Sequence, residues 1–210
     1  LAPTELRAAR LAAGIELGEL RFGLAGSSAA LAFQEVAAQA FGGTLAVAPF
    51  AYDLEGGSGE FVVQLTGVDL ARLLALYGER IAGSGMLDGT LPVSVAGAAI
   101  SIRDGTVTAR APGGFIRLAP ELTRATGQPG LDFALAALAD FTYTRLAADV
   151  DYAPTGDLTL GVALQGRNPA VEGGRPIHYN LRVTENVPQL LESLTLHERL
   201  VRDIERRVTE

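Results

Sequence analysis

The chain has 210 residues, a net charge of −7 at pH 7 and no Cys, Trp or Lys, so all 17 of its basic residues are Arg. The absence of Cys excludes disulfides, thiolate catalysis and zinc sites built from Cys, and an acidic chain without a basic patch argues against a nucleic-acid partner. Hydrophobic residues make up 48% of the chain, yet no apolar run reaches the roughly 20 residues that a membrane-spanning helix needs.

The first third of the chain is expected to consist mostly of strands, because apolar and polar residues alternate there. The elements expected are a short helix over 1–13 and strands over 15–24, 44–54 and 60–66. Residues 29–41 stay ambiguous, since their alanines favour a helix while their apolar positions also fit a strand. Pro49 indicates an edge or a bulge within the second of these strands.

At the start of the middle part of the chain, the spacing of apolar residues changes from that of a strand to that of a helix. Leu70, Leu73, Leu74 and Tyr77 fall at helical spacing, which predicts a helix over 68–77 that Asp69 caps and Gly78 ends. The glycine-rich residues 83–89 are interpreted as a turn, because their spacing matches neither a dinucleotide-binding loop nor a P-loop.

Residues 91–111 predict a three-stranded antiparallel meander. Two-residue turns are expected at Gly97-Ala98 and Asp104-Gly105, since both sequences tolerate the positive φ of tight hairpin turns. This register places apolar side chains on one face and Ser, Thr and Arg on the other. The apolar face collects Leu91, Val93, Val95, Ile100, Ile102 and Val107.

The last part of the chain alternates again, after a helix predicted over 131–138. A strand is expected before this helix, at 115–118, and three more after it, at 141–152, 157–165 and 177–183. In the strand at 157–165, Leu158, Leu160, Val162 and Leu164 alternate without interruption. Residues 186–210 are predicted to be a terminal helical segment, in two pieces, that closes one end of the sheet.

No catalytic or metal-binding pattern is evident. The histidines, His178 and His197, are isolated from each other, and Ser58 and Ser84 are flanked by glycine without a nucleophile-elbow motif. The aspartates between 149 and 157 lack the ligand spacing of an EF-hand. We therefore expect no catalytic residue, no metal and no cofactor, and a binding or conduit role. The apolar stripes fit either the core of a sandwich or a surface that contacts a ligand.

Several motifs resemble the C-terminal region of the YdbH family, which comprises AsmA-like bacterial intermembrane phospholipid transport proteins related in architecture to TamB. The motifs are Ser84–Val93 (SGMLDGTLPV), Asp104-Gly105 followed by 111–114 (APGG), 164–169 (LQGRNP), and Asn180–Asn186 with the following Leu190-Leu191 and Ser193-Leu194. They consist of glycines, turns and aliphatic residues rather than catalytic groups.

The resemblance implies a mainly β fold with flanking helices, in which a long, twisted antiparallel sheet curls into an open groove, an incomplete barrel. It implies a strand at residues 29–41, and a single module over 1–210 that is the C-terminal fragment of a larger periplasm-spanning protein. It also implies the periplasm of a Gram-negative bacterium, an inner-membrane anchor in the full-length protein, and a small outer-membrane lipoprotein as partner.

The leading hypothesis is a non-enzymatic conduit that moves phospholipids between the inner and outer membranes along an apolar groove. The candidate residues that contact acyl chains are Leu91, Val93, Val95, Ile100, Ile102, Val107, Leu158, Leu160, Val162 and Leu164. An edge strand could accept a strand of the lipoprotein, and its candidate residues are His178, Tyr179, Asn180, Leu181, Arg182 and Val183. The alternative is a β-sandwich scaffold or protein-binding module involved in outer-membrane assembly.

Overall fold

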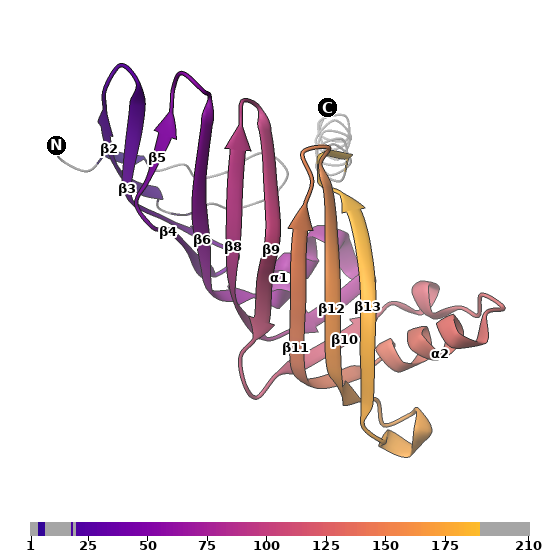
Figure 1. Ribbon diagram of the computed structural model, residues 1–210. Coiled ribbons are helices and arrows are strands. Elements are labelled where there is room, and N and C mark those ends of the chain that lie inside the picture. The colour runs from indigo at the N-terminus through magenta and orange to yellow at the C-terminus, as the bar shows by residue number, and fades with distance from the viewer. Residues whose placement is uncertain (1–3, 7–17, 19, 190–210) are drawn as a thin grey trace, which may run out of the picture.

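The computed structural model describes residues 4–6, 18 and 20–189. Within this part, thirteen strands form one antiparallel sheet that curls but does not close into a barrel (Figure 1). The strands are β1 Thr4–Leu6, β2 Leu20–Gly26, β3 Ala30–Ala40, β4 Gly43–Val47, β5 Phe50–Asp53, β6 Ser58–Asp69, β7 Ile81–Ser84, β8 Met86–Ala96, β9 Ala99–Ala109, β10 Gly114–Leu118, β11 Phe141–Tyr152, β12 Asp157–Arg167 and β13 Ile177–Asn186.

The helices are short and lie between strands. They are α1 Leu70–Leu74, α2 Pro129–Leu138, and the 3-10 turns η1 Ala75–Arg80, η2 Pro120–Thr123 and η3 Glu172–Gly174. None of the helices in the described part reaches the length and hydropathy that a transmembrane helix requires.

Most neighbours in the sheet are also neighbours in the chain. The sheet runs in the order β1-β2-β3-β4-β6-β8-β9-β11, and β12 and β13 continue it beyond β11. Strands β4 and β5 both lie between β3 and β6. They are separated at Pro49, which has no N–H to donate in a central strand.

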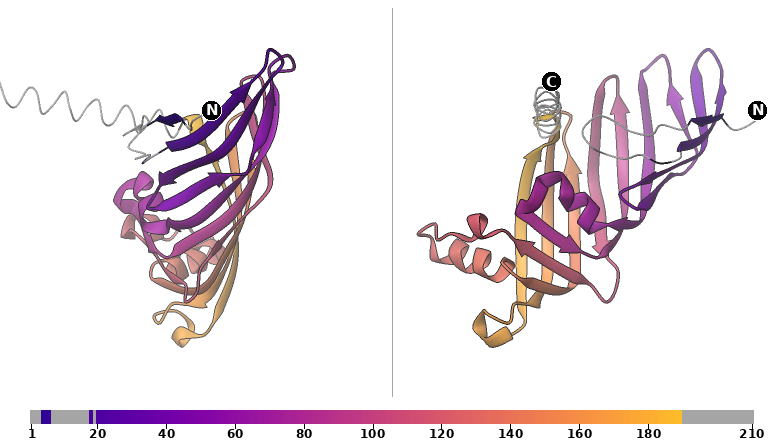
Figure 2. Two further views of the ribbon diagram at one scale, coloured as in Figure 1. Left: turned by 90° about the vertical axis from the view of Figure 1, so that its left-hand side faces the viewer. Right: turned by 180° about the vertical axis from the view of Figure 1, so that it is seen from behind.

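A second layer covers one side of the sheet at its C-terminal end. Strands β7 and β10 pair with each other, and β10 also pairs with the beginning of β11. In the right-hand view of Figure 2, α1 lies over β11, β12 and β13. Leu70 of α1 belongs to the same buried cluster as Phe141, Tyr143 and Leu164. The hydrophobic core therefore lies where α1, β7 and β10 pack on the sheet.

The helix expected in the middle of the chain is confirmed. The Asp69 side chain accepts a hydrogen bond from Ala71 N at 2.9 Å, which caps α1. The helix continues as a 3-10 turn until Gly78, whose φ of 68° interrupts it. The strand implied for residues 29–41 is also confirmed, as β3.

Three expectations are wrong. Asp104-Gly105 is not a turn, because β9 continues through it. Residues 83–89 are not a turn either, because they belong mostly to β7 and β8. Gly85 joins these strands with φ of 135°, and its backbone lies against the Tyr143 hydroxyl. The helix expected over 1–13 fails at Thr4–Leu6, which is a strand because it pairs with β2. Of the terminal segment 186–210, residues 190–210 lie outside the described part.

Candidate functional site

The ten residues predicted to contact acyl chains lie on one side of the sheet. Partners in neighbouring strands share a face, and β8 and β9 place Val93 opposite Ile102 and Val95 opposite Ile100. Leu91 follows the same alternation, and Gly89, two residues before it, pairs with Val107. The six predicted residues of β8 and β9 therefore share a face.

The same face continues across β11 into β12. Val107 pairs with Ala148 of β11, and Ala148 pairs with Val162 of β12. Along β12 the predicted residues alternate with Thr159, Gly161 and Ala163. The four predicted residues of β12, Leu158, Leu160, Val162 and Leu164, thus join the six of β8 and β9.

A β-bulge at Asp104 keeps Val107 on this face. Three residues of β9, from Arg103 to Gly105, lie opposite two residues of β8, and Asp104 has a φ of 54°. The extra residue shifts the alternation by one position. Asp104 N donates a hydrogen bond to Asp151 Oδ1 of β11 at 3.2 Å, which fastens the bulge. The sequence analysis placed Val107 on this face by means of a turn at Asp104-Gly105. That turn is wrong, because β9 continues through these residues, whereas the face predicted for Val107 is correct.

Three other bulges have the same effect. The pairing shifts by one residue at Glu35 in β3, at Gly67 in β6 and at Thr144 in β11. Glu35 and Gly67 have φ values of 50° and 63°. Across each bulge, apolar residues three positions apart keep to one face, although alternation alone would separate them. These residues are Phe33 and Val36, Leu65 and Val68, and Tyr143 and Leu146.

The apolar face differs in exposure from one part to another. Leu164, under the second layer, is 1% exposed, and Val93 is 8% exposed. In contrast, Ile100 at the β8–β9 turn is 48% exposed and Val183 of β13 is 43% exposed. The remaining residues predicted to contact acyl chains are half-buried. The face is therefore a core at one end and an accessible apolar surface near the hairpin turns.

The sequence prediction missed the aromatic part of this face. Phe33, Phe50 and Phe61 come from β3, β5 and β6, and their rings form a row. The Phe33 and Phe50 rings stack with centroids 4.8 Å apart, and the Phe61 ring lies 4.5 Å from Phe50 at a tilt of 32°. Phe61 pairs with Val93, so the aromatic row continues the predicted set. The alternation of apolar residues in 44–54 and 60–66 could have indicated Phe50 and Phe61, because it predicts that each stretch has one apolar side.

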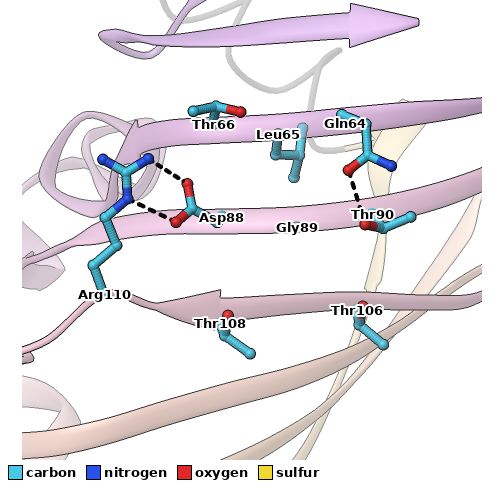
Figure 3. A pocket seen from close by; sticks show the side chains of 9 residues that line it. All are labelled: Gln64, Leu65, Thr66, Asp88, Gly89, Thr90, Thr106, Thr108 and Arg110. Atoms are coloured by element: carbon cyan, nitrogen blue, oxygen red, sulfur yellow. Dashed lines mark hydrogen bonds and ion pairs between the residues drawn. The ribbon is translucent and has the colours of Figure 1, made fainter. Parts of the chain in front are cut away.

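The opposite side of the sheet is polar and contains a shallow hollow of about 410 Å³ over β6, β8 and β9 (Figure 3). Its lining residues are Gln64, Leu65, Thr66, Asp88, Gly89, Thr90, Thr106, Thr108 and Arg110. Within it, Thr90 Oγ1 donates a hydrogen bond to Gln64 Oε1 at 2.9 Å.

The ion pair in this hollow holds the bulge of β6. Arg110 Nε and Nη2 donate to the Asp88 carboxylate at 2.6 and 2.7 Å, and Gly67 N donates to Asp88 Oδ1 at 2.9 Å. The hydrogen bonds from Arg110, and then that from Gly67, lower the pKa of Asp88. We interpret these contacts as structural. They stabilise the bulge from the polar side of the sheet, and the bulge keeps both Leu65 and Val68 on the apolar side.

The predicted edge residues lie in β13, which pairs with β12 alone among the described strands. Tyr179, Leu181 and Val183 pair with Leu164, Val162 and Leu160, so they belong to the apolar face. The Tyr179 hydroxyl is buried without a hydrogen-bond partner, and this burial raises its pKa. His178, Asn180 and Arg182 alternate with these residues and lie on the polar side.

The fold and the face together define an open β-sheet protein that presents an extended apolar side. The sequence matches the family described as YdbH-like, intermembrane phospholipid transport protein YdbH, over residues 1–209. The chain belongs to this family, whose described role is lipid transport rather than a reaction. No protein with a curated description and no solved structure matches the chain.

Proposed function

We propose that the apolar side of the sheet carries the acyl chains of phospholipids as they move between two membranes. One observation supports this most strongly: residues from β8, β9 and β12 share an apolar face that stays half-buried or exposed near the hairpin turns, while the other face is polar. A monomeric protein rarely exposes an extended apolar surface unless it binds something there.

The energetics favour such a surface. Each CH₂ group of a lipid tail costs about 0.8 kcal/mol to expose to water, so a tail of about sixteen carbons costs on the order of 12 kcal/mol. Aliphatic side chains offset this cost without directional contacts, which allows a tail to slide. Neighbouring strands lie about 4.8 Å apart, so the face extends for roughly 40 Å from β2 to β13. This length exceeds the roughly 15 Å depth of one leaflet's hydrocarbon.

We further propose that the chain is the C-terminal part of a periplasmic bridge in a Gram-negative bacterium, anchored in the inner membrane in the full-length protein. Membership of an intermembrane transport family supports this role. The outer edge of β13 is our candidate for receiving a strand of a small outer-membrane lipoprotein, because edge strands offer unpaired backbone groups. The same edge also supports the alternative of a protein-binding module without lipid transport.

Native mass spectrometry of the purified chain tests the proposal. We expect co-purifying phospholipid, and we expect less of it in the double variant Ile100→Asp, Val183→Asp, because two accessible positions of the apolar face become charged. Ser94→Asp is the matched control, since Ser94 is exposed on the polar face of β8. A lipid-free mass for the unmodified chain, or equal loss of lipid in the control, would favour the protein-binding module instead.

A further inference from the structure

Glu185 of β13 is a charged residue on the apolar side of the sheet. It pairs with Leu158 of β12, and Val183, two residues before it, pairs with Leu160. Since alternate residues of a strand share a face, the Glu185 side chain lies on the same side as these apolar residues. In β8, β9, β11, β12 and β13, all within the described part of the chain, every other position on this side, apart from the bulges, is aliphatic, aromatic or glycine.

A row of paired residues, here called the cross-strand row, leads across the sheet to Glu185. Each member lies opposite the next one in a neighbouring strand, and all of them except Val93 are half-buried. The row consists of Phe61, Val93, Ile102, Tyr152, Leu158 and Glu185. Five steps of about 4.8 Å make it roughly 24 Å long, which exceeds the roughly 15 Å depth of one leaflet's hydrocarbon. An acyl chain on this row can therefore have its headgroup beside Glu185, in the strand at the edge of the sheet (Figure 1).

No basic residue of the described part forms an ion pair with Glu185. The ion pairs between described residues involve other acidic side chains. The nearby Asp157 differs from Glu185, because Asn186 Nδ2 and Thr155 Oγ1 donate hydrogen bonds to it at 2.9 and 2.8 Å. A half-buried carboxylate without such a partner is unfavourable on an apolar surface. It therefore favours a ligand that brings positive charge to this point.

Tyr77 of η1 lies close to this carboxylate. Burial raises the pKa of the Tyr77 hydroxyl, and the charge of Glu185 raises it further. Since η1 directly follows α1, the two polar groups come from the second layer and from the edge strand. A primary ammonium has three N–H donors, and the two carboxylate oxygens and the phenol oxygen are possible acceptors for them.

We propose that Glu185, with Tyr77 beside it, binds the ammonium of an amine-bearing phospholipid headgroup, such as that of phosphatidylethanolamine, while an acyl chain lies along the cross-strand row. This inference rests on the proposed lipid path, and it adds the class of headgroup that the path selects. A lipid fits both features, because one molecule carries the apolar tail and the amine, whereas a lysine of a protein partner supplies the charge alone. A headgroup without an amine, such as phosphatidylglycerol, brings its phosphate to the carboxylate with no compensating cation.

Competition between two lipids with identical acyl chains tests this inference, because the contacts of the tails are then the same. The purified chain is incubated with mixed micelles that contain equal amounts of dioleoyl phosphatidylethanolamine and dioleoyl phosphatidylglycerol. Native mass spectrometry then gives the ratio of the two bound lipids. We expect a preference for phosphatidylethanolamine of about fivefold, as a partly exposed ion pair can provide. Glu185→Gln should remove most of this preference, and Glu185→Arg should favour phosphatidylglycerol.

Glu60→Gln is the matched control, because Glu60 is exposed on the polar side of β6, where it pairs with Ser94. It removes the same charge from the chain and should leave the lipid ratio unchanged. Glutamine has nearly the shape of glutamate, so Glu185→Gln should remain folded, which circular dichroism checks.

The outcomes separate this inference from the proposed lipid path. Equal uptake of both lipids by the unmodified chain, a full preference in Glu185→Gln, or an equal loss of preference in Glu60→Gln would overturn the headgroup site and leave the lipid path intact. If the unmodified chain binds neither lipid, both the path and the headgroup site are contradicted.

Discussion

Ile100 and Leu164 lie on the same side of the same sheet, yet one is 48% exposed and the other 1%. Both occupy strands in which apolar residues alternate with small or polar ones. The difference comes from the second layer, since α1, β7 and β10 cover the face near Leu164. Alternation thus determines which side is apolar, and long-range packing determines whether that side becomes a core or a surface.

The largest expected effect tests this difference directly. Leu164→Ala should lower the free energy of unfolding by about 3 kcal/mol, because it opens a cavity in the buried cluster. Ile100→Ala, the matched change on the accessible part of the face, should lower it by less than about 1 kcal/mol. Urea denaturation of both variants measures the two values. Equal losses would contradict the division of the face into a core and a surface.

A smaller effect is expected at the Asp104 bulge, which keeps β9 in register with both of its neighbours. Asp104→Val should destabilise the protein by about 1–2 kcal/mol, because a β-branched residue tolerates positive φ poorly. Asp104→Gly is the control, and we expect it to be close to neutral since glycine adopts this conformation freely. If the urea midpoints of the two variants agree, the positive φ at this position is not important for stability.

Most strands could be predicted because each strand alternates apolar and polar residues, and a strand is specified locally. The open, curled sheet was implied by the family resemblance, since alternation alone also fits a sandwich. The bulge at Asp104 could not be distinguished from a turn, since Asp-Gly provides positive φ in both cases. The pairing of β9 with Ala147–Tyr152 of β11, some forty residues later in the chain, determines that Asp104 forms a bulge rather than a turn. In the same way, Gly85 suits a turn locally but serves the close approach of Tyr143.

The face of each candidate residue was predictable, whereas its exposure was not. Val93 and Val95 have the same sequence pattern, but Val93 is 8% exposed and Val95 is only half-buried. The aromatic row of Phe33, Phe50 and Phe61 required the pairing of three strands, which the separate stretches do not specify.

The most direct test of the central proposal compares two adjacent residues that point to opposite sides of β9. A photo-reactive amino acid at Ile100 should crosslink to phospholipid in cells, whereas the same amino acid at Ser101, which pairs with Ser94 on the polar face, should not. Lipid adducts at Ile100 alone are the predicted result. Adducts of equal yield at both positions, or at Ser101 alone, would contradict a lipid path along the apolar face.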